Sequence, residues 1–165
     1  MNDTLQLVET VCAGPHPAPV NRIAEFEKRI LATNTPLVDL PTIHRFTPGL
    51  YIREVKMSAN HIYTTRIHKT THPFVVSCGR LTVFHVDGSS REIRAPHTGI
   101  TQPGAHRAIY CHEDCIWTTF HPNPTGEENI EQLEAMLVEP WAEHLKERHG
   151  HQPVVESFDK RKELT

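Results

Sequence analysis

The sequence has little of several features that define protein classes. Four cysteines among 165 residues are too few for a small disulfide-stapled scaffold, so free and mostly buried thiols are expected. Lysine and arginine number 17 and aspartate and glutamate 20, a formal net charge of −3, so the basic surplus typical of nucleic-acid-binding surfaces is missing. The longest apolar runs, such as residues 135–138, are far too short to span a bilayer. The length and composition therefore predict a single soluble domain.

Other signals are missing from the start of the chain and from its motifs. Asp3 and Glu9 occupy the region where a secretory signal would carry a basic start and an apolar stretch. We therefore expect a cytoplasmic protein with no membrane or nucleic-acid partner. The sequence also contains no P-loop, dinucleotide fingerprint or nucleophile elbow.

Proline and histidine, in contrast, are abundant, with thirteen of each. The prolines and the eight glycines lie between short apolar runs, which predicts many turns and short strands. Histidine is the commonest metal ligand, although at least half of these residues are expected to be ordinary surface histidines. Cys111 and Cys115 could form half of a zinc site, but their spacing is wide and no second pair is evident.

We expect three regions along the chain. Residues 1–36 form an N-terminal arm with little structure up to residue 20, followed by a helix that Asn21 caps and that ends near Asn34. Residues 37–123 contain short strands at intervals of about 8–12 residues, typical of an antiparallel sandwich or barrel.

The third region, residues 124–165, changes to a helical period. Thr125 and Glu128 form a capping-box pattern. The apolar residues between Ile130 and Leu145 then recur on one helical face, with Pro140 placed to bend or divide the helix. Beyond about residue 149 we expect a mobile polar tail.

Two predicted hairpins bring histidines together. His68 and His72 flank a three-residue link, and a turn there would place them opposite each other, with Cβ atoms about 4.5–5.5 Å apart. Two imidazoles in that relation can chelate one divalent ion.

The second hairpin depends on its turn. A two-residue turn at 113–114 would place His106 opposite His121 and Tyr110 opposite Trp117. A three-residue turn would shift the register and separate them. Four histidines around one ion, or four isolated strand histidines, are both compatible with the residues alone.

The sequence around the first pair resembles the first motif of the cupin superfamily, G-x5-H-x-H-x3/4-E-x6-G. In residues 66–79, His68 matches the second histidine, Arg66 stands at the first, and His72 stands at the glutamate. The stretch 103–106 resembles the second motif, P-x-G-x2-H, with a shifted spacing. His106 is then the nearest match to the last ligand, although strict spacing would place Arg107 there.

This resemblance covers residues 49–121 and is strongest to small single-domain cupin-like proteins of phages and bacteria. It implies an all-β core, a double-stranded β-helix or jelly-roll barrel, with flanking N- and C-terminal helices. It also implies a metal or small ligand at the barrel mouth, a ligand set of His68, His72 and His121, and a homodimer.

A site built from neutral histidines leaves the charge of a bound ion uncompensated. Iron, manganese, nickel or zinc could occupy it, and the site would favour an anionic or oxygen-rich small molecule. Arg66 could bind a carboxylate in a forked way, or could pair with an acid such as Glu54. Tyr110 and Trp117 could form an apolar substrate wall, or could be core residues.

Three functions follow from these observations. The protein is a metal-dependent dioxygenase, isomerase or lyase, a cupin that binds a ligand without turnover, or a protein-interaction scaffold. A fold shared by so many functions does not choose among them.

Overall fold

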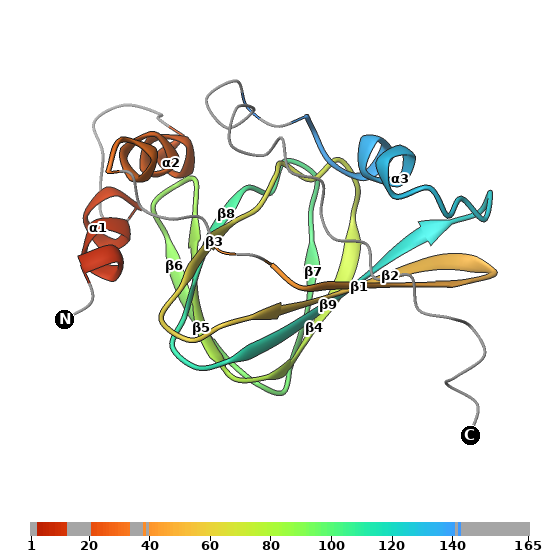
Figure 1. Cartoon of the computed structure of the whole chain (residues 1–165), viewed down its shortest axis with the longest axis horizontal. Coiled ribbons are helices and arrows are strands. Elements are labelled where there is room, and N and C mark those ends of the chain that lie inside the picture. Colours follow the sequence, from red (N-terminus) through yellow and green to blue (C-terminus); the bar gives the residue numbers. More distant parts are fainter. Residues whose placement is uncertain (1–2, 13–20, 34–37, 39, 141, 143–165) are drawn as a thin grey trace.

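A computed structural model of the chain describes residues 3–12, 21–33, 38, 40–140 and 142. Within these residues, two antiparallel sheets face each other, as the predicted all-β core requires (Figure 1). The five-stranded sheet has the order β1-β2-β9-β4-β7 and the four-stranded sheet the order β3-β8-β5-β6. The strands are β1 (Thr42–Thr47), β2 (Gly49–Met57), β3 (Ile62–Thr64), β4 (His72–Cys78), β5 (Arg80–His85), β6 (Ser90–Arg94), β7 (His97–Thr101), β8 (Arg107–Cys111) and β9 (Cys115–Asn123).

The core lies between the sheets because strand side chains alternate between the two faces. In β9 each second residue from Cys115 to Asn123 is buried. In β4, His72, Phe74 and Val76 are buried in the same way. The interior is therefore apolar over most of its length and becomes polar where these two strands contribute histidines.

Neither predicted hairpin forms, and the register arguments built on them were wrong. β8 pairs with β3 and β5, whereas the next strand, β9, pairs with β2 and β4. The turn after residue 111 thus crosses from one sheet to the other, so Tyr110 does not oppose Trp117. Likewise β3 and β4 belong to different sheets.

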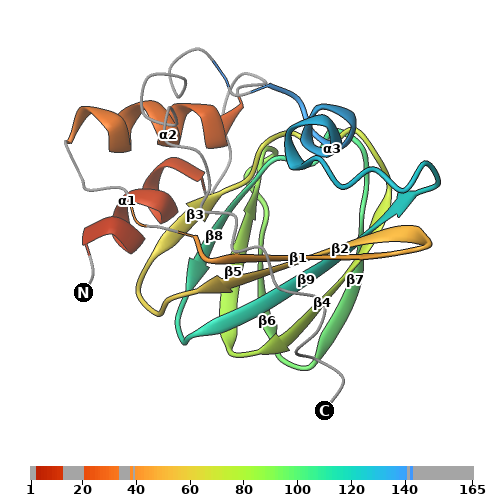
Figure 2. The ribbon, with the colours of Figure 1, turned by 45° about the vertical axis from the view of Figure 1, so that its right-hand side comes forward.

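Two helices cover the outer face of the four-stranded sheet (Figures 1 and 2). α2 (Arg22–Ala32) begins after Asn21, whose side chain accepts a hydrogen bond from the Ala24 N–H, as the sequence predicts. α1 (Asp3–Cys12) lies where we predicted an arm with little structure, and that prediction was wrong. Val8 and Cys12 are fully buried, so α1 shares an apolar core with α2 and the sheet.

α3 (Ile130–Leu137) lies against the end of the sandwich beside β2 and β9 (Figures 1 and 2). Its N-cap is Asn129, which accepts a hydrogen bond from the Gln132 N–H, so the predicted capping box at 125–128 was wrong. Leu133 and Leu137 bury its apolar face against Tyr51. The helix ends before Val138, and the predicted tail beyond residue 149 lies outside the described residues.

No helix in the described part of the chain is long and apolar enough to cross a membrane.

Candidate metal centre

Three histidines from separate segments meet inside one end of the sandwich. His68 lies in the connection between β3 and β4, His72 opens β4, and His121 lies in β9. The ring centroids of His68 and His72 are 4.8 Å apart, and those of His72 and His121 are 4.2 Å apart. We call this group the histidine trio.

Strand register explains how two members of the trio meet. β4 and β9 are antiparallel neighbours in which Phe74 pairs with Thr119. Continuing that register by two residues on each strand places His72 opposite His121, on the inward face. His68 is held by the loop: its backbone N–H donates to the Ala105 carbonyl, and it forms an isolated bridge with Val138.

Each member of the trio has one buried ring nitrogen with no hydrogen-bond partner. These atoms are His68 Nδ1, His72 Nε2 and His121 Nδ1. Buried polar atoms are nearly always satisfied, so three such nitrogens in neighbouring rings require an explanation. A cation bound by their lone pairs would provide one.

The other ring nitrogens of two members are already engaged. His72 Nδ1 lies 3.1 Å from the Thr70 carbonyl oxygen, which can only accept, so Nδ1 carries the proton and Nε2 the lone pair. The Thr119 hydroxyl donates to the Arg53 carbonyl and therefore accepts from His121 Nε2–H at 3.0 Å. His121 Nδ1 is thus left as a lone pair. Fixing one nitrogen to orient the other is typical of metal-ligating histidines.

The electrostatic environment keeps the trio neutral. Burial, with a smaller contribution from neighbouring positive charge, lowers the pKa of His68 to about 3 and the pKa of His121 to about 3. Burial also lowers the pKa of His72, against a small opposing effect of its bond to Thr70. Neutral imidazole is the form that binds a metal.

Sequence reasoning missed a second set of groups beside the trio. The Tyr51 ring stacks on His121 at a centroid distance of 5.6 Å, and its hydroxyl lies 2.7 Å from His44 Nδ1. His44 Nε2 is buried without a partner. The alternation along residues 51–57 was a signal in the sequence that could have placed Tyr51 on the inward face, where the structure pairs it with His121.

Arg53 brings a positive charge to the same end of the sandwich. It pairs with His44 on β1 and with Thr119 on β9. Burial lowers its pKa, yet an arginine stays protonated, and its charge helps to lower the pKa of His68 and His121. Among the described residues Arg53 has no ion-pair partner, so an anion would be favoured near the trio.

As the side chains stand, no three histidine, cysteine, aspartate or glutamate side chains within the described ranges are arranged to hold a metal ion. The rings of the trio are close together, but they do not form such a three-ligand group as they stand. Coordination would require the rings to turn about their side-chain torsions.

The structure does not bring His106 to the trio. Its ring lies against α2, where Nε2 is 3.2 Å from Glu27 Oε1 and Nδ1 is 3.3 Å from Asn21 Nδ2. Both nitrogens are occupied, so the prediction of His106 as a metal ligand was wrong. The predicted hairpin would have paired His106 with His121 of β9, but β9 belongs to the five-stranded sheet and β8, which follows His106, belongs to the four-stranded sheet.

The predicted substrate residues also separate. Arg66 forms an ion pair with Glu134 of α3 at 2.7 Å. Of the two roles considered for Arg66, the structure therefore shows pairing with an acid of the chain, although the acid is not Glu54. Tyr110 donates to Asn60 and packs against the helices, outside the sandwich interior. Trp117 does point inward and stacks on Phe74 at 4.3 Å. Trp117 is therefore the one of the three that lines the interior.

No protein-family model and no curated protein sequence matches this chain. Among solved structures it is similar to a cupin-2 domain protein from Shewanella frigidimarina, with 14% identity, 58% of this chain and 91% of the other covered, and a TM-score of 0.42. It is also similar to the EutQ protein of Clostridium difficile, with 13% identity, 52% and 69% covered, and a TM-score of 0.43. A salicylate 1,2-dioxygenase from Pseudaminobacter salicylatoxidans gives 12% identity, 72% and 35% covered, and a TM-score of 0.49.

Cupins are thus among the similar structures, as the motif resemblance predicts. At these identities the likeness concerns the fold and indicates neither an activity nor a ligand for this chain.

Proposed function

We propose that this protein binds a divalent metal ion through His68, His72 and His121 and uses it to hold a small anionic or oxygen-rich molecule. The observation that carries the proposal is the set of three buried ring nitrogens without partners, one on each of three touching histidines. The hydrogen bonds that His72 Nδ1–H donates to the Thr70 carbonyl and His121 Nε2–H donates to the Thr119 hydroxyl support it, because they leave the other nitrogen of each ring as a lone pair.

The charge around the trio supports an anionic ligand. Three neutral imidazoles do not reduce the charge of a divalent ion. Arg53 and Arg107 both add positive charge near the trio, and both help to lower the pKa of His68. A bound ion would act as a Lewis acid with positions open to oxygen donors.

Metal analysis of the native chain tests the proposal. The protein is purified without an affinity tag or a nickel column, and bound metal is measured by mass spectrometry. We expect close to one equivalent in the native chain and a loss of at least tenfold in His72→Gln and His121→Gln. Glutamine is similar to histidine in size and polarity but lacks the imidazole nitrogens.

His61→Gln is the matched control, because the His61 ring is half-buried but bonds to the nearby carbonyl of Ala59 rather than to the trio. It should retain the metal. Metal retained in both trio variants, with folding verified by circular dichroism, would refute the site.

Oxygen uptake separates an oxidising enzyme from a binding protein. The metal-loaded protein is mixed with candidate diols and hydroxy acids, and oxygen is followed with an electrode. Consumption that disappears in His121→Gln supports a dioxygenase. Binding of the same molecules without consumption supports the alternative of a non-catalytic ligand-binding module.

A further inference from the structure

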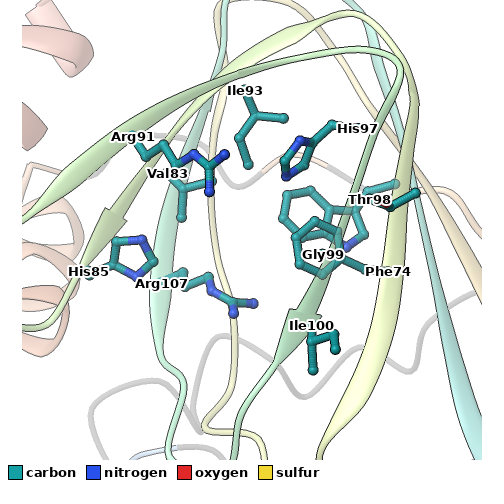
Figure 3. Close-up of a pocket in the computed structure, with 11 residues that line it drawn as sticks. Phe74, Val83, His85, Arg91, Ile93, His97, Thr98, Gly99, Ile100 and Arg107 are labelled. Carbon is teal, nitrogen blue, oxygen red and sulfur yellow. The ribbon is translucent and has the colours of Figure 1, made fainter.

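A cavity of about 300 Å³ opens between the edge strands of the two sheets, β6 and β7. Figure 3 shows its lining side chains, which come from β4, β5, β6, β7, β8 and β9. It is distinct from the histidine trio, none of whose members lines it. Its volume is at the small end of the range for ligand sites, which suits a single-ring molecule and excludes a nucleotide.

The polar part of the cavity is basic. Arg91, Arg107, His85 and His97 line it, and the described lining residues include no acid. Figure 3 shows the Arg91 and Arg107 side chains directed into the same space. Within the described residues neither arginine forms an ion pair, so their charge is not neutralised by a carboxylate of the chain.

Arg107 is held in place rather than free to move into solvent. It is 9% exposed, and its Nη1 donates to the Thr101 hydroxyl at 3.0 Å. A guanidinium has five N–H donors, so donors remain for a ligand. Burial lowers the pKa of Arg107, but the group stays charged, and a buried cation without a counter-ion favours anion binding.

One wall of the cavity is aromatic, and the guanidinium carbon of Arg107 lies over it, 5.9 Å from the centroid of the Phe74 ring. The rings of Phe74 and Trp117 stack at 4.3 Å with an interplanar angle of 20°. Gly99 makes room for this wall, because a Cβ there would lie 2.5 Å from Phe74 Cζ. Val83 and Ile93 complete an apolar surface suited to a planar body.

We propose that this cavity binds a small planar organic anion, with its carboxylate at Arg91 and Arg107 and its ring against Phe74 and Trp117. Thr101 pairs with His72 in the β4–β7 register, so Arg107 lies between the cavity and the trio. A small organic anion is also the ligand class of the proposed function, and the biological role of this separate cavity rests on that function. Binding of the anion itself needs no metal.

Calorimetric titration of the metal-free protein with benzoate tests the proposal, with benzamide and inorganic phosphate as comparison ligands. Benzoate carries both the ring and the charge, benzamide the ring alone, and phosphate the charge alone. We expect benzoate to bind at least about tenfold more tightly than either, since a charge-assisted bond is lost with benzamide. Benzoate should also change tryptophan fluorescence, because Trp117 lines the cavity.

Arg91→Gln should weaken benzoate binding by about tenfold. Arg91 is exposed, so the variant is expected to fold. Arg94→Gln is the matched control: it removes the same charge from the same strand, but Arg94 alternates to the other face and lies 3.9 Å from Glu113.

Three results would overturn the cavity assignment. They are equal affinity for benzoate and benzamide, phosphate binding as tightly as benzoate, and an equal effect of the two arginine variants. Benzoate binding by the metal-free chain, combined with no metal uptake by the native chain, would refute the proposed metal function while leaving the anion site intact.

Discussion

At the scale of single residues, the Thr119 hydroxyl determines which nitrogen of His121 is free. It donates to the Arg53 carbonyl and accepts from His121 Nε2. The hydroxyl therefore contributes to the site without touching the ion. Partners of this kind typically change metal affinity by about 10–100-fold when they are removed.

Thr119→Val tests this role. Valine keeps the shape but removes the acceptor, so we expect metal affinity to fall by about tenfold or more. Thr118→Val is the control, because Thr118 precedes Thr119 on β9 and faces outward. Competition titration with a chromophoric chelator measures both, and equal affinities in the two variants would contradict the role.

The pH dependence of stability follows from the lowered pKa of His68 and His121, each about 3 in the folded chain against an ordinary value of 6.5. Between these pH values the unfolded chain binds more protons than the folded chain. The free energy of unfolding therefore falls as pH falls from about 6.5 toward 3, by up to about 1.4 kcal/mol per pH unit for each histidine.

Urea unfolding of the metal-free protein at a series of pH values measures this slope. The double variant H68Q/H121Q should show a flatter profile across the same window. An unchanged slope in the double variant would show that other groups cause the acid sensitivity.

Residue types and spacing selected His68, His72, His106 and His121 as candidates, and the cupin resemblance implied the set of His68, His72 and His121. The reason given for their meeting was wrong, since both pairs depended on hairpins that the chain does not form. His106 shows the limit of that reasoning. The side chain of His106 turns toward α2 because it binds Glu27 of that helix, and the packing of the helix could not be read from the strand pattern.

At the scale of elements, α3 links the end of the sandwich to the trio. Its backbone and that of the following residues bond to the segment around His68: the Lys69 N–H donates to Leu137 O, and the Glu139 N–H donates to Ile67 O. The ion pair between Arg66 and Glu134 adds a further contact. Docking of α3 therefore fixes the loop that carries His68.

Leu133→Ala tests the docking of α3. Leu133 is 1% exposed and packs beside Tyr51. The space left by the shortened side chain should therefore lower the free energy of unfolding by about 2–5 kcal/mol. Met136→Ala, at a position 51% exposed on the same helix, should change it by less than about 0.5 kcal/mol. Chemical denaturation measures both, and equal losses would show that α3 is not docked as described.

The helices show which element signals can be read from a sequence. Asn21 directly before an apolar periodic run marked the start of α2 correctly. The capping pattern at 125–128 failed because Asn129, closer to the apolar residues, caps α3 instead. α1 was missed because its proline-rich neighbours dominated the composition of that segment.

At the scale of the whole molecule, the predicted sandwich is confirmed, but its topology could not be read from local pattern. Short alternating strands predict antiparallel sheets without saying which strands are neighbours. Here β8 and β9 follow each other in sequence and lie in different sheets. That crossing brings β9 beside β4, and with it His121 beside His72.

The helices that flank the strands are packed on the sandwich itself. α1 and α2 bury apolar residues against the four-stranded sheet, and α3 does so against Tyr51. Dimerisation stays a prediction, which sedimentation equilibrium of the full chain would test.

Anomalous diffraction from crystals of the full chain grown with cobalt(II) tests the central claim most directly. We predict one strong peak within about 2.0–2.3 Å of nitrogen atoms of His68, His72 and His121, with all three rings turned toward it. A peak at other histidines alone, or no peak with the trio as described here, would contradict the metal centre.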